Sequence, residues 1–219
     1  MSAARTERER LRIFLGVFPP REVQHAAERV IERLRQPEDG VSWVRPDNLH
    51  FTLRFLGDLG EDGARRAAVA AADAAIARPA FDARLGSLGA FPSARKARVL
   101  WIGLAEGAEG LIGLARAVEE ALQRKGFGRA ERPFAPHLTI GRVRELGRDW
   151  SATLAGADAA VSSVASDAPI PFAAGDAAIP SATGDGVTRF RVDRVLVVHS
   201  QLSPRGSIYS VRAEVPLAG

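Results

Sequence analysis

Apolar residues along this chain fall into two kinds of run, which predict alternating strands and helices. Short apolar segments bounded by proline, glycine or aspartate are typical of strands. We expect strands over 11–18, 48–57, 81–90, 98–104, 136–143, 194–202 and 207–215, the last two forming a hairpin through the turn at 203–206. Segments with apolar residues every three or four positions predict helices over 21–36, 61–78 and 107–125. This order indicates an α+β protein whose two halves resemble each other.

Residues 151–187 interrupt this pattern. They are rich in Ala, Ser, Gly, Asp and Pro, with four Asp and no Lys or Arg. A loop of that length is unusual in a compact domain. Its Ala-rich start favours a helix, and we expect the rest to be a flexible surface insertion within a single bilobal domain spanning 1–219.

The amino-acid composition excludes several kinds of functional site but says little about the fold. The chain has 219 residues, of which 46% are hydrophobic and 26% charged, enough for one packed domain or two similar lobes. The absence of cysteine excludes disulfides, iron–sulfur clusters, Cys-ligated zinc and a thiol nucleophile.

The charge balance is compatible with an anionic partner. The net charge is +4, and 28 of the 30 basic residues are arginine, a bias that a GC-rich genome also produces. Because 151–187 carries four Asp and no base, the rest of the chain carries +8. The N-terminus lacks the apolar core of a signal peptide, and no apolar run approaches the ~20 residues of a membrane span, so we expect a cytoplasmic protein.

Two histidines stand in the same sequence frame. The tetrapeptides 50–53 (His-Phe-Thr-Leu) and 137–140 (His-Leu-Thr-Ile) are both flanked by strand-forming residues. Threonine occurs only six times in the chain. The probability that two of the four histidines have a threonine two residues later by chance is therefore roughly 0.5%. A strictly alternating strand puts residues i and i+2 on one face. Each motif therefore presents an imidazole and a hydroxyl together, with the intervening apolar residues, including Phe55, packed behind.

Two imidazoles across a cleft form a natural acid–base pair, because histidine titrates near neutral pH. Threonine hydroxyls can donate hydrogen bonds to an anionic oxygen, where charge develops during phosphoryl transfer. Neither motif carries a carboxylate at its threonine position, and no third ligand is evident. We therefore expect no metal and no cofactor.

With these paired motifs the chain resembles the 2H phosphoesterase superfamily, specifically the bacterial and archaeal RNA 2′,3′-cyclic phosphodiesterases once called 2′-5′ RNA ligases. The resemblance rests on RIFLGVFPP, NLHFTLRFLG, VLWIGL, RPFAPHLTIGR and HSQLSPRGSIYSV. It implies a duplicated bilobal α+β fold, in which two mainly antiparallel sheets face a central cleft with helices outside. It also implies metal-independent opening of a 2′,3′-cyclic phosphate to leave a 2′-phosphomonoester.

The resemblance assigns catalytic roles to the paired motifs. His50 matches the proton donor to the departing 3′ oxygen, and His137 matches the proton acceptor that activates water. Thr52 and Thr139 match the threonines that hold the phosphate.

Three further residues match substrate-binding positions of the family. An arginine follows the second motif at Arg142, although a strict two-residue period would turn it away from His137 unless Gly141 allows a bulge. Phe14 and Tyr209 match aromatic positions that could flank a base, and core packing is an equally open interpretation of both.

Two other functions remain open from the sequence. The cleft could serve an RNA-end binding module with vestigial catalysis, or it could carry out reversible 2′-5′ ligation through the same residues. We expect a monomer whose partners are RNA ends or nucleotides bearing a cyclic phosphate, with no membrane. Of the other histidines, His25 is expected at a helix surface and His199 packed along a strand.

Overall fold

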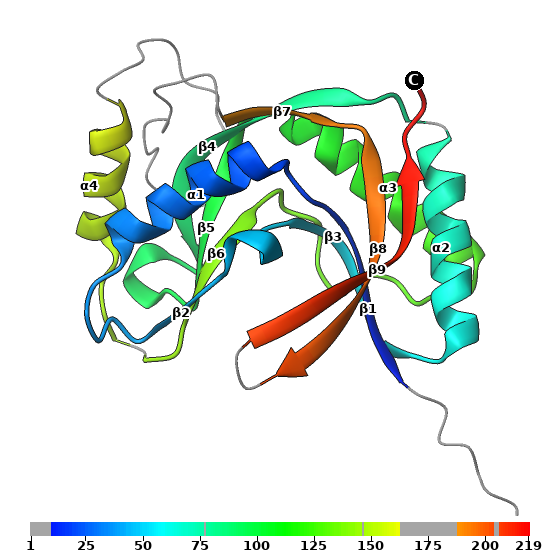
Figure 1. Ribbon diagram of the computed structural model, residues 1–219, viewed down its shortest axis with the longest axis horizontal. Helices are drawn as coiled ribbons and strands as arrows, with labels where there is room; N and C mark the ends of the chain where they lie inside the picture. The colour runs from blue at the N-terminus through cyan, green and yellow to red at the C-terminus, as the bar shows by residue number, and fades with distance from the viewer. Residues whose placement is uncertain (1–9, 77, 146, 163–187, 204–205) are drawn as a thin grey trace, which may run out of the picture.

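The computed structural model describes residues 10–76, 78–145, 147–162, 188–203 and 206–219, and the α+β class is confirmed (Figure 1). Its helices are α1 (Arg21–Leu34), α2 (Glu61–Ala75), α3 (Ala108–Arg124) and α4 (Ser151–Ser162). Its strands are β1 (Leu11–Val17), β2 (Val41–Trp43), β3 (Phe51–Leu59), β4 (Phe81–Phe91), β5 (Val99–Glu106), β6 (Leu138–Val143), β7 (Arg189–Val192), β8 (Arg194–Ser203) and β9 (Gly206–Pro216). Short 3₁₀ turns lie at Pro46–Asn48 and Ala94–Lys96.

The strands form a curved antiparallel sheet with two four-stranded halves. Among the described residues the order is β7-β4-β5-β6-β3-β1-β8-β9, with β2 paired to the side of β6. One half is β7-β4-β5-β6 and the other is β3-β1-β8-β9. The halves are joined where β3 meets β6, at the residue pair Phe51 and Leu138. The two expected sheets are therefore continuous through a narrow seam.

Two of the four described helices, α1 and α3, are exchanged between the halves, whereas α2 packs against strands of its own half. Helix α1 follows β1 but packs against β6 and α4 of the other half, and α3 follows β5 but packs against β3 and α2. Figure 1 shows α1 and α4 together on one side of the molecule and α2 and α3 on the other. Each half of the sheet is thus covered by a helix from the other half of the pattern.

The apolar periodicity predicted from sequence accounts for the core. Helix α1 buries Val23, Ala27, Ile31 and Leu34, and α3 buries Leu111, Leu114, Val118 and Leu122. Helix α3 ends at Arg124 and is followed by Gly126, whose φ of 83° is left-handed and whose N–H donates to the carbonyl of Gln123. These helices lie on the sheet face that carries Leu15, Phe51 and Leu138, all fully buried.

Two strands were not predicted, and part of one prediction lies outside the described residues. Strands β2 and β7 have three and four residues, too few to show a period of their own. The Ala-rich start of 151–187 is helical, as α4. Residues 163–187 and the turn residues 204–205 lie outside the described part of the chain.

Candidate active site

The two His-x-Thr motifs meet at the seam of the sheet. Phe51 and Leu138 are paired and fully buried, so alternation puts the flanking residues on the opposite, concave face. In an antiparallel register the neighbours of that pair are Thr52 beside His137 on one side, and His50 beside Thr139 on the other. The register thus brings the two motifs together on this face of the sheet.

A backbone hydrogen bond fixes the tautomer of each imidazole in the same way. Nδ1 of His50 donates to the carbonyl oxygen of Asn48, and Nδ1 of His137 donates to that of Ala135, both at 2.7 Å. Because a carbonyl only accepts, Nδ1 carries the hydrogen in both rings, and Nε2 keeps the lone pair that can take up a proton. The hydroxyl of Thr52 donates to Nε2 of His50 at 2.9 Å.

His50 is enclosed by three aromatic rings. Phe14 and Phe18 stack on it with centroid distances of 4.6 and 5.0 Å, and Tyr209 meets it edge-on at 5.4 Å. Gly16 leaves the room for this, since a Cβ there would lie 3.4 Å from the imidazole and 2.9 Å from a backbone oxygen. Phe18, which the sequence interpretation overlooked, shares a strand face with Phe14 and could have been found by that spacing.

The structure favours packing for Phe14. Its side chain is only 3% exposed, and its ring contacts His50, Phe18 and Tyr209. Phe14 therefore packs against the imidazole of His50 and holds it in place. Tyr209 is partly exposed, and its strand is anchored beside the motif because Asn48 donates to the carbonyl of Ser207 at 2.8 Å.

The surroundings of His137 are more open. The ring of Phe91, 36% exposed, meets it edge-on at 5.1 Å. Trp101 lies 5.2 Å from Phe91, opposite Thr139, and its indole N–H has no partner among the described residues. The indole packs directly against the backbone of Gly89, where a Cβ would lie 2.3 Å from the ring. Neither Phe91 nor Trp101 was singled out from sequence, since both stand within ordinary apolar strand runs.

A β-bulge brings Arg142 to the same face as the second motif. On β5, Trp101 lies opposite Thr139 and Val99 opposite Arg142. Residues 99 and 101 share a face, so Thr139 and Arg142 share it too, although they are three positions apart. Ile140 is the extra residue of the bulge. Arg142 therefore lies on the histidine side of the sheet, through the irregularity that the glycine before it suggested.

The first motif contains the corresponding bulge, and it overturns one prediction. Gly16 lies opposite Thr52 and Phe14 opposite Phe55, so Leu53 is the extra residue. The expectation that Phe55 packs into the core is wrong. Phe55 lies on the concave face and is 44% exposed. In both strands the bulge falls three residues after the histidine, and the residue five after it, Phe55 or Arg142, is turned to the concave face.

Burial and a neighbouring positive charge keep both imidazoles neutral. The pKa of His50 is lowered to about 4, mainly by desolvation and also by the charges of Arg142 and of protonated His137. The pKa of His137 is also lowered, first by burial and then by Arg142. The guanidinium of Arg142 thus acts on both rings.

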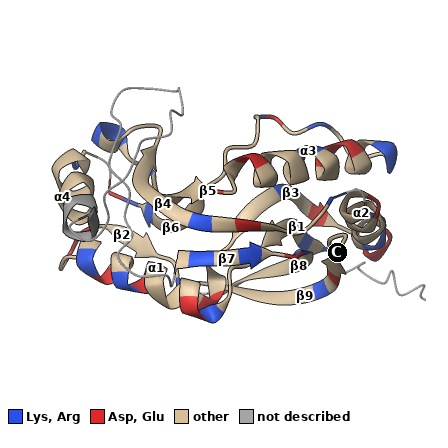
Figure 2. Cartoon of the chain, turned by 90° about the horizontal axis from the view of Figure 1, so that it is seen from above, with Lys and Arg blue, Asp and Glu red and all other residues tan. Residues whose placement is uncertain are grey.

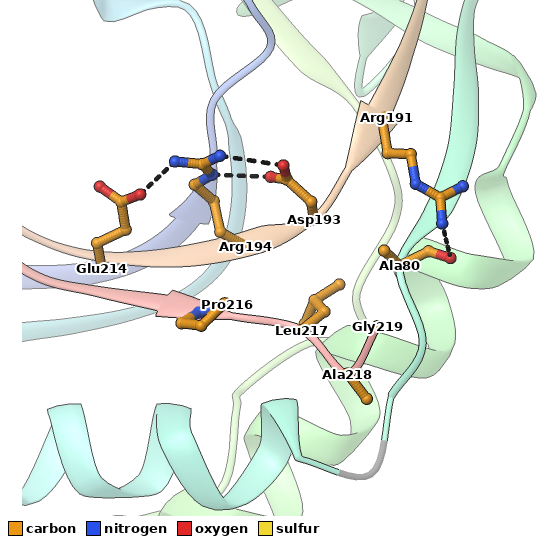
Figure 3. Close-up of a pocket in the computed structure, with 9 residues that line it drawn as sticks. All are labelled: Ala80, Arg191, Asp193, Arg194, Glu214, Pro216, Leu217, Ala218 and Gly219. Carbon is orange, nitrogen blue, oxygen red and sulfur yellow. Dashed lines mark hydrogen bonds and ion pairs between the residues drawn. The ribbon is translucent and has the colours of Figure 1, made fainter.

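Other parts of the described chain do not compete with this site. No group of three His, Asp or Glu residues capable of holding a metal ion occurs there, and no described helix is long and apolar enough to cross a membrane. Figure 2 shows acidic and basic residues interspersed along the helices. A shallow hollow of about 530 Å³ lies near the C-terminus, but the arginines around it bond to neighbouring protein groups (Figure 3). His25 is exposed beside Glu28 and His199 is 8% exposed, as predicted.

The chain is similar in sequence and in fold to known phosphoesterases. The profile of the family described as LigT like Phosphoesterase matches residues 17–101 and, a second time, residues 102–179. The RNA 2′,3′-cyclic phosphodiesterase of Methanothermobacter thermautotrophicus is 32% identical over 92% of this chain and 96% of the relative. The crystal structure of TT0787 from Thermus thermophilus superposes with a TM-score of 0.69 at 26% identity, covering 94% of this chain and 98% of that one. That of E. coli LigT complexed with NADP+ gives 0.66 at 26% identity, covering 96% and 99%.

Proposed function

This chain belongs to the LigT-like phosphoesterase family, and on that premise we propose that it is an RNA 2′,3′-cyclic phosphodiesterase that opens the cyclic phosphate to a 2′-phosphomonoester. One observation carries the proposal. The two tautomer-fixed imidazoles lie on one face at the seam, each with an Nε2 lone pair that can take up a proton, beside two threonine hydroxyls and Arg142. Relatives that span nearly the whole chain carry the name of this activity.

The proposed reaction moves one proton at each imidazole. Nε2 of His137 removes a proton from water as the water oxygen forms its bond to phosphorus. The bond from phosphorus to the 3′ oxygen breaks, and Nε2–H of protonated His50 delivers its proton to that oxygen. The 2′ ester bond stays intact, so the product is a 2′-phosphate with a free 3′ hydroxyl. His50 is left neutral and His137 protonated, and solvent restores both.

Threonine and arginine side chains stabilise the phosphate in this scheme. The hydroxyls of Thr52 and Thr139 donate to its non-bridging oxygens, where negative charge accumulates. In the free protein the Thr52 hydroxyl donates to Nε2 of His50. When Nε2 is protonated it can no longer accept this hydrogen bond, so the Thr52 hydroxyl is released to donate to the phosphate. Arg142 adds a charge-assisted hydrogen bond from the neighbouring bulge.

The test is turnover of a nucleoside 2′,3′-cyclic phosphate by the wild type and three histidine variants. His50→Ala and His137→Ala should each lower kcat by about 10²–10⁴-fold, the usual contribution of one general acid or base. His25→Ala is the matched control, because that histidine is exposed on α1, and it should retain full activity. Far-UV circular dichroism checks that all three variants fold.

Product analysis separates the alternatives. Phosphorus NMR should show a 2′-phosphomonoester, and an excess of EDTA should leave the rate unchanged. Binding of an RNA end without turnover would instead indicate a binding module, and joining of two RNA ends would indicate ligation. Wild-type rates in both His50→Ala and His137→Ala would remove the acid–base assignment.

A further inference from the structure

The concave face continues beyond His50 along β1, to Arg12. Residues 12, 14 and 16 of this strand share one face, and Gly16 lies opposite Thr52. Arg12 is exposed, and its guanidinium carbon lies 4.8 Å from the centre of the Phe55 ring. At ~3.3 Å per residue, Arg12 stands about 13 Å along the strand from Gly16. The bulge at Leu53 in β3, which exposes Phe55, therefore also places the Phe55 ring against the guanidinium of Arg12.

The guanidinium of Arg12 forms no ion pair with the residues that the structure describes. Asp58 is its partner across the strand pair, yet among the described residues no carboxylate lies within 4.0 Å of its guanidinium. The arginines at the C-terminal hollow differ, because Arg194 is paired with Asp193 and Glu214 (Figure 3). An unpaired guanidinium over an exposed aromatic ring is a combination suited to a phosphate and a base.

Arg12 is also continuous with the active site. Burial raises the pKa of Tyr209, and the charges of Arg142 and Arg12 partly oppose that rise, so both charges act on the ring that meets His50. Val211, which is 56% exposed, lies two residues beyond Tyr209 on β9, in register with Val198 of β8 and Phe14 of β1. Arg12, Phe55 and Tyr209 thus share the face of the sheet that carries His50.

We propose that Arg12 and Phe55 hold the nucleotide that precedes the cyclic-phosphate end of an RNA chain. Arg12 binds the phosphate that links the last two nucleotides, and the exposed part of the Phe55 ring contacts the preceding base. This inference rests on the proposed function, and it gives that function a preference for RNA ends over mononucleotides.

The test compares two substrates, a nucleoside 2′,3′-cyclic phosphate and a short RNA ending in the same group. Arg12→Gln and Phe55→Leu should lower kcat/KM for the RNA about tenfold and leave kcat/KM for the mononucleotide unchanged. The wild-type advantage for RNA should shrink as salt rises, and the Arg12→Gln variant should show a weaker salt dependence. Arg29→Ala, an exposed arginine on α1, is the matched control and should change neither substrate.

A binding measurement keeps this inference separate from the proposed function. An RNA ending in a 2′-phosphate should bind Arg12→Gln about tenfold more weakly than wild type, whereas a nucleoside 2′-phosphate should bind both equally. Equal losses for RNA and mononucleotide would overturn the subsite, because they would mean that Arg12 only supports the His50 pocket. Unchanged RNA binding and turnover would overturn it too. A wild type that binds RNA through Arg12 without hydrolysing either substrate would refute the proposed function alone.

Discussion

His50 and His137 share one hydrogen-bonding arrangement but have different surroundings. Both donate Nδ1–H to a carbonyl two residues earlier, yet stacked rings enclose His50, whereas His137 meets the edge of the Phe91 ring. The more open ring suits the base that must reach water. The enclosed ring is neutral in the free protein, since its pKa is about 4. A bound phosphate anion would offset Arg142 and favour the protonated acid.

These pKa shifts predict an acidic optimum for kcat/KM, which reports the free enzyme. The active form needs His50 protonated and His137 neutral. Above pH 4 the protonated fraction of His50 falls about tenfold per pH unit, and below the pKa of His137 the neutral base falls in the same way. Because both pKa values are lowered from 6.5, the optimum for a nucleoside 2′,3′-cyclic phosphate should lie below pH 6.5.

The profile of kcat should be displaced to higher pH, because the bound phosphate raises both pKa values. Steady-state kinetics across pH 4–9 measures both profiles, and imidazole nitrogen NMR follows each ring directly. An optimum of kcat/KM above pH 7 would show that the free imidazoles are not depressed, or that the proton roles are assigned incorrectly.

At the scale of single elements, the bulges set which side chains reach the site. Sequence alternation correctly predicted the faces of both motifs up to the bulge, including buried Phe51 and Leu138. It failed at Phe55, because alternation cannot register an extra residue that only strand pairing reveals. The glycine before Arg142 did signal the second bulge, whereas Leu53 gave no such sign.

Strand β1 makes a second contribution, by approaching the imidazole closely at Gly16. Gly16→Ala should lower kcat at least tenfold, because its Cβ would lie 2.9 Å from the carbonyl oxygen of Phe51 and 3.4 Å from His50. The adjacent strand must shift, and with it the donor imidazole. Gly128→Ala is the control, since its Cβ would meet nothing within 4 Å. Kinetics on a nucleoside 2′,3′-cyclic phosphate measures both, and equal activities would mean that the seam tolerates the displacement.

At the scale of the whole molecule, we propose that the two lobes form one cooperative domain. The periodicity predicted most helices and strands, but it could not predict that α1 and α3 cross to the opposite halves. That exchange depends on contacts between residues far apart in sequence, which local patterns do not encode. The short strands β2 and β7 were missed for the related reason that pairing, and not their own pattern, defines them.

The exchange predicts a single unfolding transition. All three tryptophans, Trp43, Trp101 and Trp150, lie with the β7-β4-β5-β6 half, whereas circular dichroism reports on both halves. Urea titrations followed by tryptophan fluorescence and by far-UV circular dichroism should coincide, because losing either half uncovers the helix packed on the other. Separate midpoints would show that the lobes unfold independently and would argue against a single domain.

The exchanged helices also bear on how such a molecule could originate by gene duplication. A chain carrying only one half would lack the helix that the other half supplies, and two copies assembled as a homodimer with a twofold axis at the seam would restore that packing. In such a homodimer the two imidazoles would be equivalent by symmetry and would share one intrinsic pKa. Fusion into one chain removes that constraint. It allows Phe14 and Phe18 to gather around one histidine only, so that an acid and a base can arise from a repeated motif.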